Sequence, residues 1–335
     1  MAKTKIAING FGRIGRLIFR QIFNDKDLEI VAINDLTDAY TLAHLLKYDT
    51  AHGKMDAEIS ASENSIIVNG KNFPVYAEKD PTMLPWKELQ VDIVVEGTGR
   101  FVTFEGSSKH LQAGAKKVLI TAPGKDSNIK TIVYSVNENI LTKEDTVVSA
   151  ASCTTNCLAP IMDVLDKNYG VVKGFMTTIH SYTADQRLQD APHSDLRRAR
   201  AAALNMIPTT TGAAKSIGKV IPSLQGKMNG IALRVPTITG SLVDVTVELK
   251  KQPTVEEINK VMKKSVSDSL IYTDEPIVSS DIIGVSAGSI FDSKLTSSLE
   301  VDGKTLYKVY SWYDNESSFV GQYIRTLKHL AKLLK

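Results

Sequence analysis

The chain has 335 residues, of which 43% are hydrophobic and 23% are charged. This length is enough for two domains with separate cores, and the composition excludes a disordered or collagen-like chain. A formal net charge of +3 is too small to indicate nucleic-acid binding, and the one dense basic cluster, at Arg197, Arg198 and Arg200, is not evidently a dedicated nucleic-acid site.

The first strong signal is a glycine-rich turn between a strand and a helix. An apolar strand is predicted at residues 5–9, and helical periodicity begins near Leu17. Between them the spacing of the glycines matches a dinucleotide-binding turn, in which one glycine permits the turn, the next lets the backbone approach a pyrophosphate, and the third lets helix and strand pack closely. In order, these glycines are Gly10, Gly12 and Gly15.

A second strand, residues 29–34, ends at Asp35. A carboxylate at this position accepts hydrogen bonds from the adenosine ribose and repels a 2′-phosphate. The sequence therefore predicts NAD, rather than NADP, as the cofactor.

Further strands are predicted at residues 91–96, 117–121 and 146–150. The first two lead into Gly97-Thr98-Gly99 and into the turn that begins at Thr121, and ligands of a parallel doubly wound sheet lie outside such strand ends. Residues 59–75 are predicted to form a hairpin that turns at Asn69-Gly70, a peripheral insert rather than a site.

The last of these strands leads into Ala151-Ser-Cys-Thr-Thr-Asn-Cys157, where Cys153 is a candidate nucleophile. A helix that starts at Ser152 or Thr154 would favour the thiolate of Cys153 through its N-terminal N–H groups and dipole. The preceding strand would bring Cys153 to the cofactor edge of the sheet. Taken alone, a lone cysteine is more often a small buried hydrophobic residue.

The two cysteines are four residues apart and do not form a disulfide framework, which indicates a reducing compartment. Residues 1–5 lead into a strand without an apolar signal core, and no apolar run approaches the ~18 residues of a membrane span. We therefore expect a soluble, cytoplasmic protein with no membrane role.

Beyond Ala151 the pattern changes to long strands, at residues 171–180, 230–235 and 241–250, separated by helical stretches. His180 ends the first of them and is a candidate general base for Cys153. A zinc site at Cys153, Cys157 and His180 is disfavoured, because a fourth ligand and paired ligand spacing are missing; no metal is predicted.

The fold predicted is α/β, with a doubly wound, mostly parallel Rossmann sheet and a second α+β catalytic domain with a mixed or antiparallel sheet. The dinucleotide-binding domain is predicted at residues 1–151, completed by a C-terminal helix within 316–335, and the catalytic domain at 152–315. The amphipathic helix itself is predicted from Phe319 to Leu334.

Two features of the second domain suit anions. Thr209-Thr-Thr-Gly212 precedes a helical run from Ala213, where it serves either phosphate binding or simple capping. Arg198 and Arg234 are in the same domain, and their guanidinium forks suit phosphate oxygens.

Taken in chain order, these motifs resemble phosphorylating, NAD-dependent glyceraldehyde-3-phosphate dehydrogenases along essentially the whole chain. The resemblance lies in five motifs: Asn9–Gly15, Ala151–Cys157, His180–Thr183, Arg197–Arg200 leading to Thr211–Lys215, and Trp312–Asn315. It implies glyceraldehyde 3-phosphate and inorganic phosphate as substrates, and a homotetramer in which the segment 181–200 reaches a neighbouring subunit's cofactor.

The resemblance also assigns residues. Cys153 would be the nucleophile and His180 its base. The inorganic-phosphate side would comprise Ser152, Thr154, Thr211, Gly212 and Arg198, and the substrate's own phosphate would be held by Thr183 and Arg234. The cofactor residues would be Phe11, Arg13, Ile14, Asp35, Lys79, Thr121 and Asn315, beside Gly10, Gly12, Gly15, Thr98 and Gly99.

Two other functions compete with this one. A related enzyme acting on erythrose 4-phosphate or a semialdehyde would share the thiol chemistry, but the two anion clusters favour a phosphorylated substrate with phosphate as nucleophile. A non-catalytic nucleotide- or RNA-binding module would keep the glycines, yet it has no need of Cys153 and His180 together.

Overall fold

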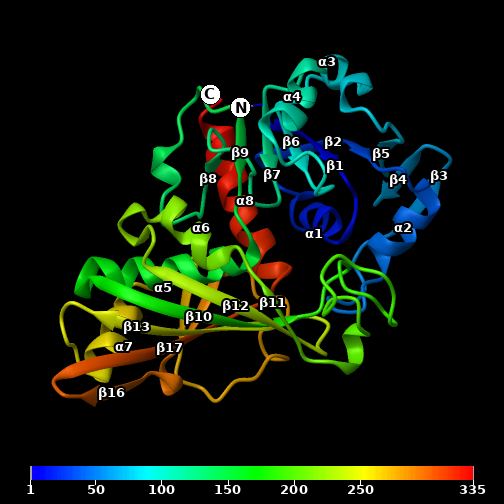
Figure 1. Cartoon of the computed structure of the whole chain (residues 1–335). Coiled ribbons are helices and arrows are strands. Elements are labelled where there is room, and N and C mark those ends of the chain that lie inside the picture. The colour runs from blue at the N-terminus through cyan, green and yellow to red at the C-terminus, as the bar shows by residue number, and fades with distance from the viewer. Residues whose placement is uncertain (1, 335) are drawn as a thin grey trace. The chain divides into compact units, whose positions relative to one another are not determined.

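The structure is a computed structural model that describes residues 2–334, and the chain divides into two compact units (Figure 1). The first unit comprises Met1–Ile132, Glu138–Ala151 and Tyr323–Lys335, and the second comprises Val133–Asn137 and Ser152–Gln322. One boundary between these units falls between Ala151 and Ser152.

The second unit ends between Gln322 and Tyr323, whereas the sequence prediction ends the catalytic domain at residue 315. The start of the C-terminal helix is bonded within the second unit, where Ser318 Oγ donates to Val285 O at 3.0 Å. Gln322 Nε2 donates to Tyr134 O at 3.1 Å, a contact that also ties residues 133–137 to this unit.

The first unit is built on a sheet whose described strands follow the order β3-β4-β5-β2-β1-β6-β7-β9-β8. Its strands are β1 (Thr4–Asn9), β2 (Leu28–Asn34), β3 (Ile59–Ser62), β4 (Ser65–Val68), β5 (Lys71–Tyr76), β6 (Ile93–Glu96), β7 (Lys117–Ile120), β8 (Lys130–Thr131) and β9 (Val147–Ser149). Its helices are α1 (Arg13–Ile22), α2 (Ala39–Lys47), α3 (Trp86–Leu89) and α4 (Phe104–Gln112), with 3-10 turns η1 (Pro81–Met83) and η2 (Glu138–Ile140).

From β5 through β2 to β8 every neighbouring pair is parallel, which confirms the predicted doubly wound sheet. Strands β6, β7 and β9 are buried at every residue, as expected of central parallel strands covered on both faces. The strand predicted at 91–96 is two residues shorter, because Val91 N donates to Trp86 O instead.

The segment 59–75 forms three strands rather than one hairpin. The β4–β5 turn lies at Asn69-Gly70 as predicted, and both residues have positive φ (50° and 77°). However, β5 pairs in parallel with β2 through Ile33–Val75 and Asn34–Tyr76. The prediction of a peripheral insert is therefore wrong for β5, which extends the main sheet.

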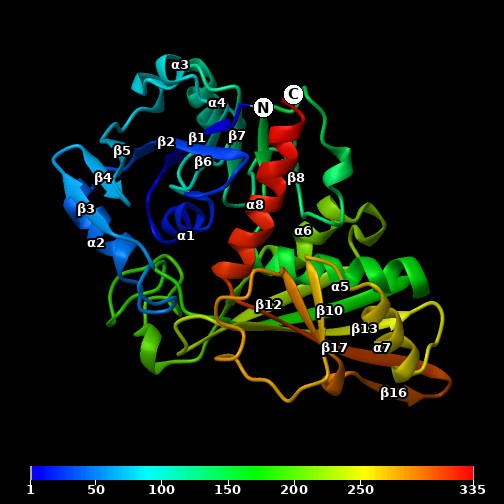
Figure 2. The ribbon, with the colours of Figure 1, turned by 180° about the vertical axis from the view of Figure 1, so that it is seen from behind.

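The second unit holds a mixed sheet in the order β11-β12-β10-β13-β17-β15-β14, with β16 paired to β17 as the long orange hairpin of Figure 2. Its strands are β10 (Val171–Ser181), β11 (Ile207–Thr210), β12 (Met228–Val235), β13 (Ser241–Leu249), β14 (Leu270–Thr273), β15 (Ser289–Asp292), β16 (Ser297–Val301) and β17 (Lys304–Tyr313). Its helices are α5 (Cys153–Tyr169), α6 (Ala213–Val220) and α7 (Val255–Lys264), with 3-10 turns η3 (Ala202–Leu204), η4 (Pro222–Leu224) and η5 (Ser293–Leu295).

The alternation predicted along β13 is present. Val243, Val245 and Val247 are fully buried, whereas the residues between them are partly exposed. Helix α5 packs against β13, β15 and β17, so the buried side chains of this sheet form the core beneath α5.

The C-terminal helix α8 (Ser317–Lys332) begins two residues before the predicted start. Its predicted apolar face is buried in the first unit at Tyr323, Leu327 and Leu330, and Tyr323 OH donates to Leu119 O at 2.7 Å. None of the helices within residues 2–334 is both long and apolar enough to span a bilayer.

Candidate active site

The glycine turn of the first unit has the backbone that the spacing predicts. Gly10 has φ +92°, a conformation that other residues rarely adopt. A Cβ on Gly15 would lie 2.2 Å from Gly10 O, so only glycine allows this packing of α1 on the turn. Gly12 is the N-cap of α1 without a side-chain cap, and nothing lies within 4 Å of a Cβ built on it.

These observations fit a dinucleotide. An N-terminal turn with no capping side chain presents backbone N–H groups to an anion, and the space beside Gly12 lets a pyrophosphate approach. Asp35 Oδ2 accepts from Phe11 N at 2.7 Å and Oδ1 accepts from Thr37 N at 3.0 Å, which fixes the carboxylate beside the turn while leaving lone pairs for ribose hydroxyls.

Arg13 and Ile14 occupy the first turn of α1, and Arg13 forms a two-point ion pair with Asp49 at 3.0 and 3.2 Å. Thr121 N and Oγ1 both donate to Glu96 O, at 3.0 and 3.1 Å, and Thr98 follows β6 in an exposed loop with Gly99. Lys79 is also exposed.

Asn315 belongs to the second unit, in contrast to the other predicted cofactor residues. It is buried, and its Oδ1 accepts from Thr239 Oγ1, Gly240 N and Ser241 Oγ at 3.1–3.2 Å. The carboxamide oxygen is thus occupied within the unit, and its Nδ2 is the group that could donate to a ligand.

Cys153 is the first residue of α5, and Ser152 is the N-cap that the sequence suggested. Ser152 Oγ accepts from Thr155 N at 3.1 Å. Ala151, just before it, has φ +62°, so the chain turns sharply into the helix. This start leaves the half-buried Cys153 with Sγ 3.4 Å from His180 Nε2.

The register of the sheet places Arg234 beside the same imidazole. Strands β10 and β12 are parallel with His180 directly paired to Arg234. Arg234 Nη1 lies 2.8 Å from His180 Nδ1 and donates to Ser181 O at 3.0 Å, while Nδ1 itself lies 2.6 Å from Ser181 O. His180 Nδ1 thus faces both a guanidinium, which can only donate, and a carbonyl oxygen, which can only accept. In the tautomer whose Nδ1 proton is directed to Ser181 O, the Nε2 lone pair faces Cys153.

The surroundings disfavour charge on both members of this pair. Burial, followed by the positive charge of Arg234, lowers the pKa of His180 to about 3. Desolvation also raises the pKa of the Cys153 thiol, against the opposing effect of Arg234. Burial therefore opposes the thiolate that the helix start is predicted to favour, and Nε2 of His180 is the group placed to take the Cys153 proton as the sulfur attacks.

Because the pKa of His180 is low, the free energy of unfolding should fall as the solution becomes acidic. His180→Gln should make this dependence on pH weaker. Between the ordinary value of 6.5 and about 3, the unfolded chain binds a proton that the folded chain does not. Above pH 6.5 neither state binds this proton and the folded state keeps its full stability. As pH falls from 6.5 toward 3, protonation of the unfolded chain lowers the free energy of unfolding by at most ~1.4 kcal/mol per pH unit.

Urea unfolding of the wild type and of His180→Gln, at fixed protein concentration and at pH values from about 7 to 4, measures this effect. We expect a shallower acid loss in the variant. Parallel pH dependences in the two proteins would contradict the low pKa.

The two predicted phosphate clusters meet through Asp185. Its carboxylate accepts a short hydrogen bond from Thr183 Oγ1 and pairs with Arg198 Nη1 at 2.5 Å. Arg198 also reaches β11, where Nε donates to Thr209 Oγ1 at 2.9 Å and Nη2 donates to Thr210 O at 3.2 Å. Sequence reasoning missed Asp185, and only its position two residues after Thr183 pointed to it.

Thr211 and Gly212 precede α6. Gly212 is its N-cap, with no side-chain cap, and Thr211 Oγ1 accepts from Ala213 N at 3.2 Å. The start of α6 therefore resembles that of α1 in having a glycine as its N-cap, but its first N–H already donates to Thr211 Oγ1. A helix start of this kind suits anion binding.

Tyr313 was also missed as a contact of the site. Its buried hydroxyl lies 2.9 Å from Thr154 Oγ1 and 2.8 Å from Thr178 Oγ1, and its ring packs edge-on against His180 at 5.9 Å. It joins the start of α5 to β10, and so supports both members of the Cys153–His180 pair. Only its place in the Trp312–Asn315 motif gave a signal.

Cys157 lies one turn further along α5, is fully buried, and has its pKa raised to about 12 by burial. Its Sγ contacts Ser311 O at 3.6 Å. Within residues 2–334 no group of three or more His, Cys, Asp or Glu side chains is arranged to hold a metal ion.

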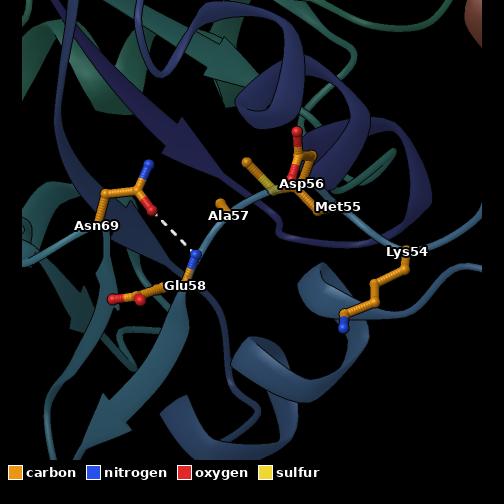
Figure 3. A pocket seen from close by; sticks show the side chains of 6 residues that line it. All are labelled: Lys54, Met55, Asp56, Ala57, Glu58 and Asn69. Carbon is orange, nitrogen blue, oxygen red and sulfur yellow. Dashed lines mark hydrogen bonds between the residues drawn. The ribbon is translucent and has the colours of Figure 1, made fainter.

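An open hollow lies elsewhere in the first unit, next to β3, as Figure 3 shows. Its lining residues are Lys54, Met55, Asp56, Ala57, Glu58 and Asn69. Glu58 N donates to Asn69 Oδ1 at 2.9 Å, and none of the six belongs to the predicted sites.

A dinucleotide-type sheet with an uncapped glycine turn, together with a unit carrying a thiol–imidazole pair and arginines, defines a dehydrogenase class that uses thiol chemistry. Comparison with known families makes this specific. Residues 4–104 match the glyceraldehyde 3-phosphate dehydrogenase NAD binding domain, and residues 152–315 match the C-terminal domain of the same family.

Full-length relatives agree. The chain is 61% identical to the glyceraldehyde-3-phosphate dehydrogenase of Mycoplasma pneumoniae, over 99% of this chain and 100% of the relative. It is 54% identical to the enzymes of that name from Clostridium pasteurianum and Streptococcus pyogenes, over 99% of this chain and at least 99% of each relative. The chain belongs to the glyceraldehyde-3-phosphate dehydrogenase family, and NAD is the cofactor of its N-terminal domain.

Proposed function

We propose that this chain oxidises glyceraldehyde 3-phosphate with NAD and inorganic phosphate to 1,3-bisphosphoglycerate and NADH, a reaction of glycolysis. The observation that carries the proposal is the 3.4 Å contact between Cys153 Sγ and His180 Nε2, with Arg234 Nη1 2.8 Å from the same imidazole. The Thr183–Asp185–Arg198 cluster belongs to the same unit.

In this proposal Cys153 attacks the aldehyde carbon, forming the C–S bond of a hemithioacetal, while His180 Nε2 takes the thiol proton. The Cys153 backbone N–H and the protonated His180 stabilise the developing oxyanion. Bound NAD supplies the acceptor for the hydride that leaves this carbon, and a thioester of Cys153 remains. His180 keeps the thiol proton on Nε2, or donates it to the substrate oxygen, while that oxygen carries negative charge in the hemithioacetal. Nε2 holds the proton again once the neutral thioester has formed.

Inorganic phosphate then attacks the thioester carbonyl, and the C–S bond breaks to release the acyl phosphate and regenerate the Cys153 sulfur. We propose that the attacking phosphate is bound by Arg198, Thr211, Gly212, Ser152 and Thr154. The substrate's own phosphate is bound by Thr183 and Arg234. The cofactor groups are those of the glycine turn with Asp35, Lys79, Thr98, Gly99, Thr121 and Asn315.

An assay of NADH formation from glyceraldehyde 3-phosphate, with and without inorganic phosphate, tests the proposal. Sustained NADH formation is expected only when phosphate is present, with clear preference for NAD over NADP. Equal steady rates without phosphate would contradict the phosphorylating reaction, and faster turnover of erythrose 4-phosphate would identify the related enzyme instead.

We also propose a homotetramer in the cytoplasm. Support for assembly comes from the segment 181–206, where Leu188 is 88% exposed, Leu196 80% and Leu204 85%, because neighbouring exposed apolar side chains gain stability when a partner covers them. A light-scattering mass of one or two chains would contradict the tetramer.

The cytoplasmic location is supported by the two free cysteines, which favour a reducing compartment.

A further inference from the structure

A buried carboxylate at the end of β6 has no part in the chemistry above. Glu96 is fully buried, and each of its oxygens accepts two hydrogen bonds. Oε2 accepts from Asn9 Nδ2 at 2.6 Å and contacts His110 Nε2 at 3.0 Å. Oε1 accepts from Thr98 N at 2.9 Å and, in a shorter contact, from Thr98 Oγ1. All four acceptor positions are thus used by donors.

The hydrogen-bond network fixes the orientation of the His110 imidazole. Trp86 Nε1 lies 3.0 Å from His110 Nδ1, and an indole N–H can only donate, so Nδ1 accepts and Nε2 carries the proton toward Glu96. Trp86 and His110 are both fully buried. The pair therefore anchors Glu96 from the protein interior.

From Glu96 the network reaches the loops that are proposed to hold the cofactor. Asn9 Oδ1 accepts from Asn34 Nδ2 at 2.7 Å, and Asn34 in turn bonds both the N–H and the carbonyl of Glu78 at 2.9 Å. Glu78 directly precedes Lys79. At the other end, a Cβ on Gly10 would lie only 2.7 Å from Thr98 N, so the Thr98 loop rests against the glycine turn.

We propose that Glu96 and His110 are positioning residues for NAD, an inference that rests on the proposed function. The carboxylate holds Thr98 through two hydrogen bonds, and it holds Asn9 at the strand end that leads into Gly10. The glycine turn, the Thr98 loop and the segment before Lys79 are thereby set in one arrangement before the cofactor arrives. Ordering these loops in advance lowers the entropy cost of binding.

Glu96→Gln tests the inference with almost no change in shape. If the amide nitrogen replaces Oε1, it faces the Thr98 N–H, which cannot accept. If it replaces Oε2, it faces Asn9 Nδ2 and the His110 N–H that Trp86 fixes. Either orientation therefore sets donor against donor and breaks a hydrogen bond of Glu96 either to Thr98 or to Asn9 and His110.

We expect the Kd for NAD, measured by calorimetric titration of the folded protein, to rise about tenfold in Glu96→Gln. The control is Lys117→Met at the opposite end of the strands, where the buried Lys117 Nζ donates to Lys143 O and Asp145 O at 2.7 and 2.6 Å. This variant should be destabilised toward urea and keep the wild-type Kd.

If Glu96→Gln does not fold, Thr98→Val is the second test. It removes, at an exposed loop position, the hydroxyl that donates to Glu96 Oε1 and accepts from Arg100 N. Thr98→Val should weaken NAD binding and Thr98→Ser should restore it. Wild-type Kd values in the folded Glu96 or Thr98→Val variants would overturn the inference and leave the network a purely structural role. Failure of the wild type itself to bind NAD would instead overturn the proposed function.

Discussion

Cys153→Ser is expected to abolish turnover, by at least ~10³-fold, while NAD binding stays close to that of the wild type. The proposed mechanism uses the Cys153 sulfur, 3.4 Å from His180 Nε2, as its nucleophile. A serine hydroxyl is far less acidic than a thiol and cannot replace it. With one exception, the proposed cofactor residues belong to the first unit, whereas Cys153 belongs to the second. Steady-state NADH formation and an NAD titration measure the two quantities.

Cys157→Ser is the matched control, because it makes the same change one helical turn away. Cys157 is fully buried, its pKa is raised to about 12 by burial, and a serine there could donate to Ser311 O, which Sγ now contacts at 3.6 Å. Most activity should remain. Loss of turnover in Cys157→Ser with activity retained in Cys153→Ser would reverse the assigned roles.

The first unit could be predicted closely because its signals are local. The spacing of Gly10, Gly12 and Gly15 reports on a single turn, and the structure confirms the positive φ of Gly10 and the close packing at Gly15. The pairing of β5 with β2 could not be predicted in this way. It joins residues 42 positions apart, such as Ile33 and Val75, and no local pattern specifies that register.

The candidate site was predictable in its residue types and less so in its contacts. The sequence indicated His180 and Arg234 separately, but only the parallel register of β10 and β12 sets them side by side. One consequence is that Arg234 adds to burial in lowering the pKa of His180 to about 3, an effect that the sequence did not indicate. Asp185 escaped notice because its role depends on Arg198, which reaches it across a loop.

The second large effect concerns the two arginines, which should fail at different stages of the reaction. Aldehyde attack and hydride loss need the substrate's own phosphate held, but they do not need inorganic phosphate. Only thioester breakdown does. Arg198→Ala should therefore spare one burst of NADH per competent site, while it slows steady turnover and raises the phosphate concentration required.

Arg234→Ala should weaken substrate use from the first turnover, by roughly 2–5 kcal/mol in kcat/KM, the cost of removing one partner of a buried charged contact. It should also act on the base. Burial is the larger cause of the low His180 pKa, and the Arg234 charge lowers the pKa further, so its loss raises that pKa. Because the base must be unprotonated, the acid limb of the pH–rate profile should move to higher pH.

Arg234→Lys separates the two effects, since it keeps a charge beside His180 Nδ1 but loses the guanidinium fork. It should weaken substrate use and leave the acid limb near that of the wild type. Rapid-mixing traces of NADH formation, recorded across a range of pH, measure both the burst amplitude and the acid limb of the pH–rate profile. A lost burst in Arg198→Ala beside a normal burst in Arg234→Ala would mean that the two phosphate sites are exchanged.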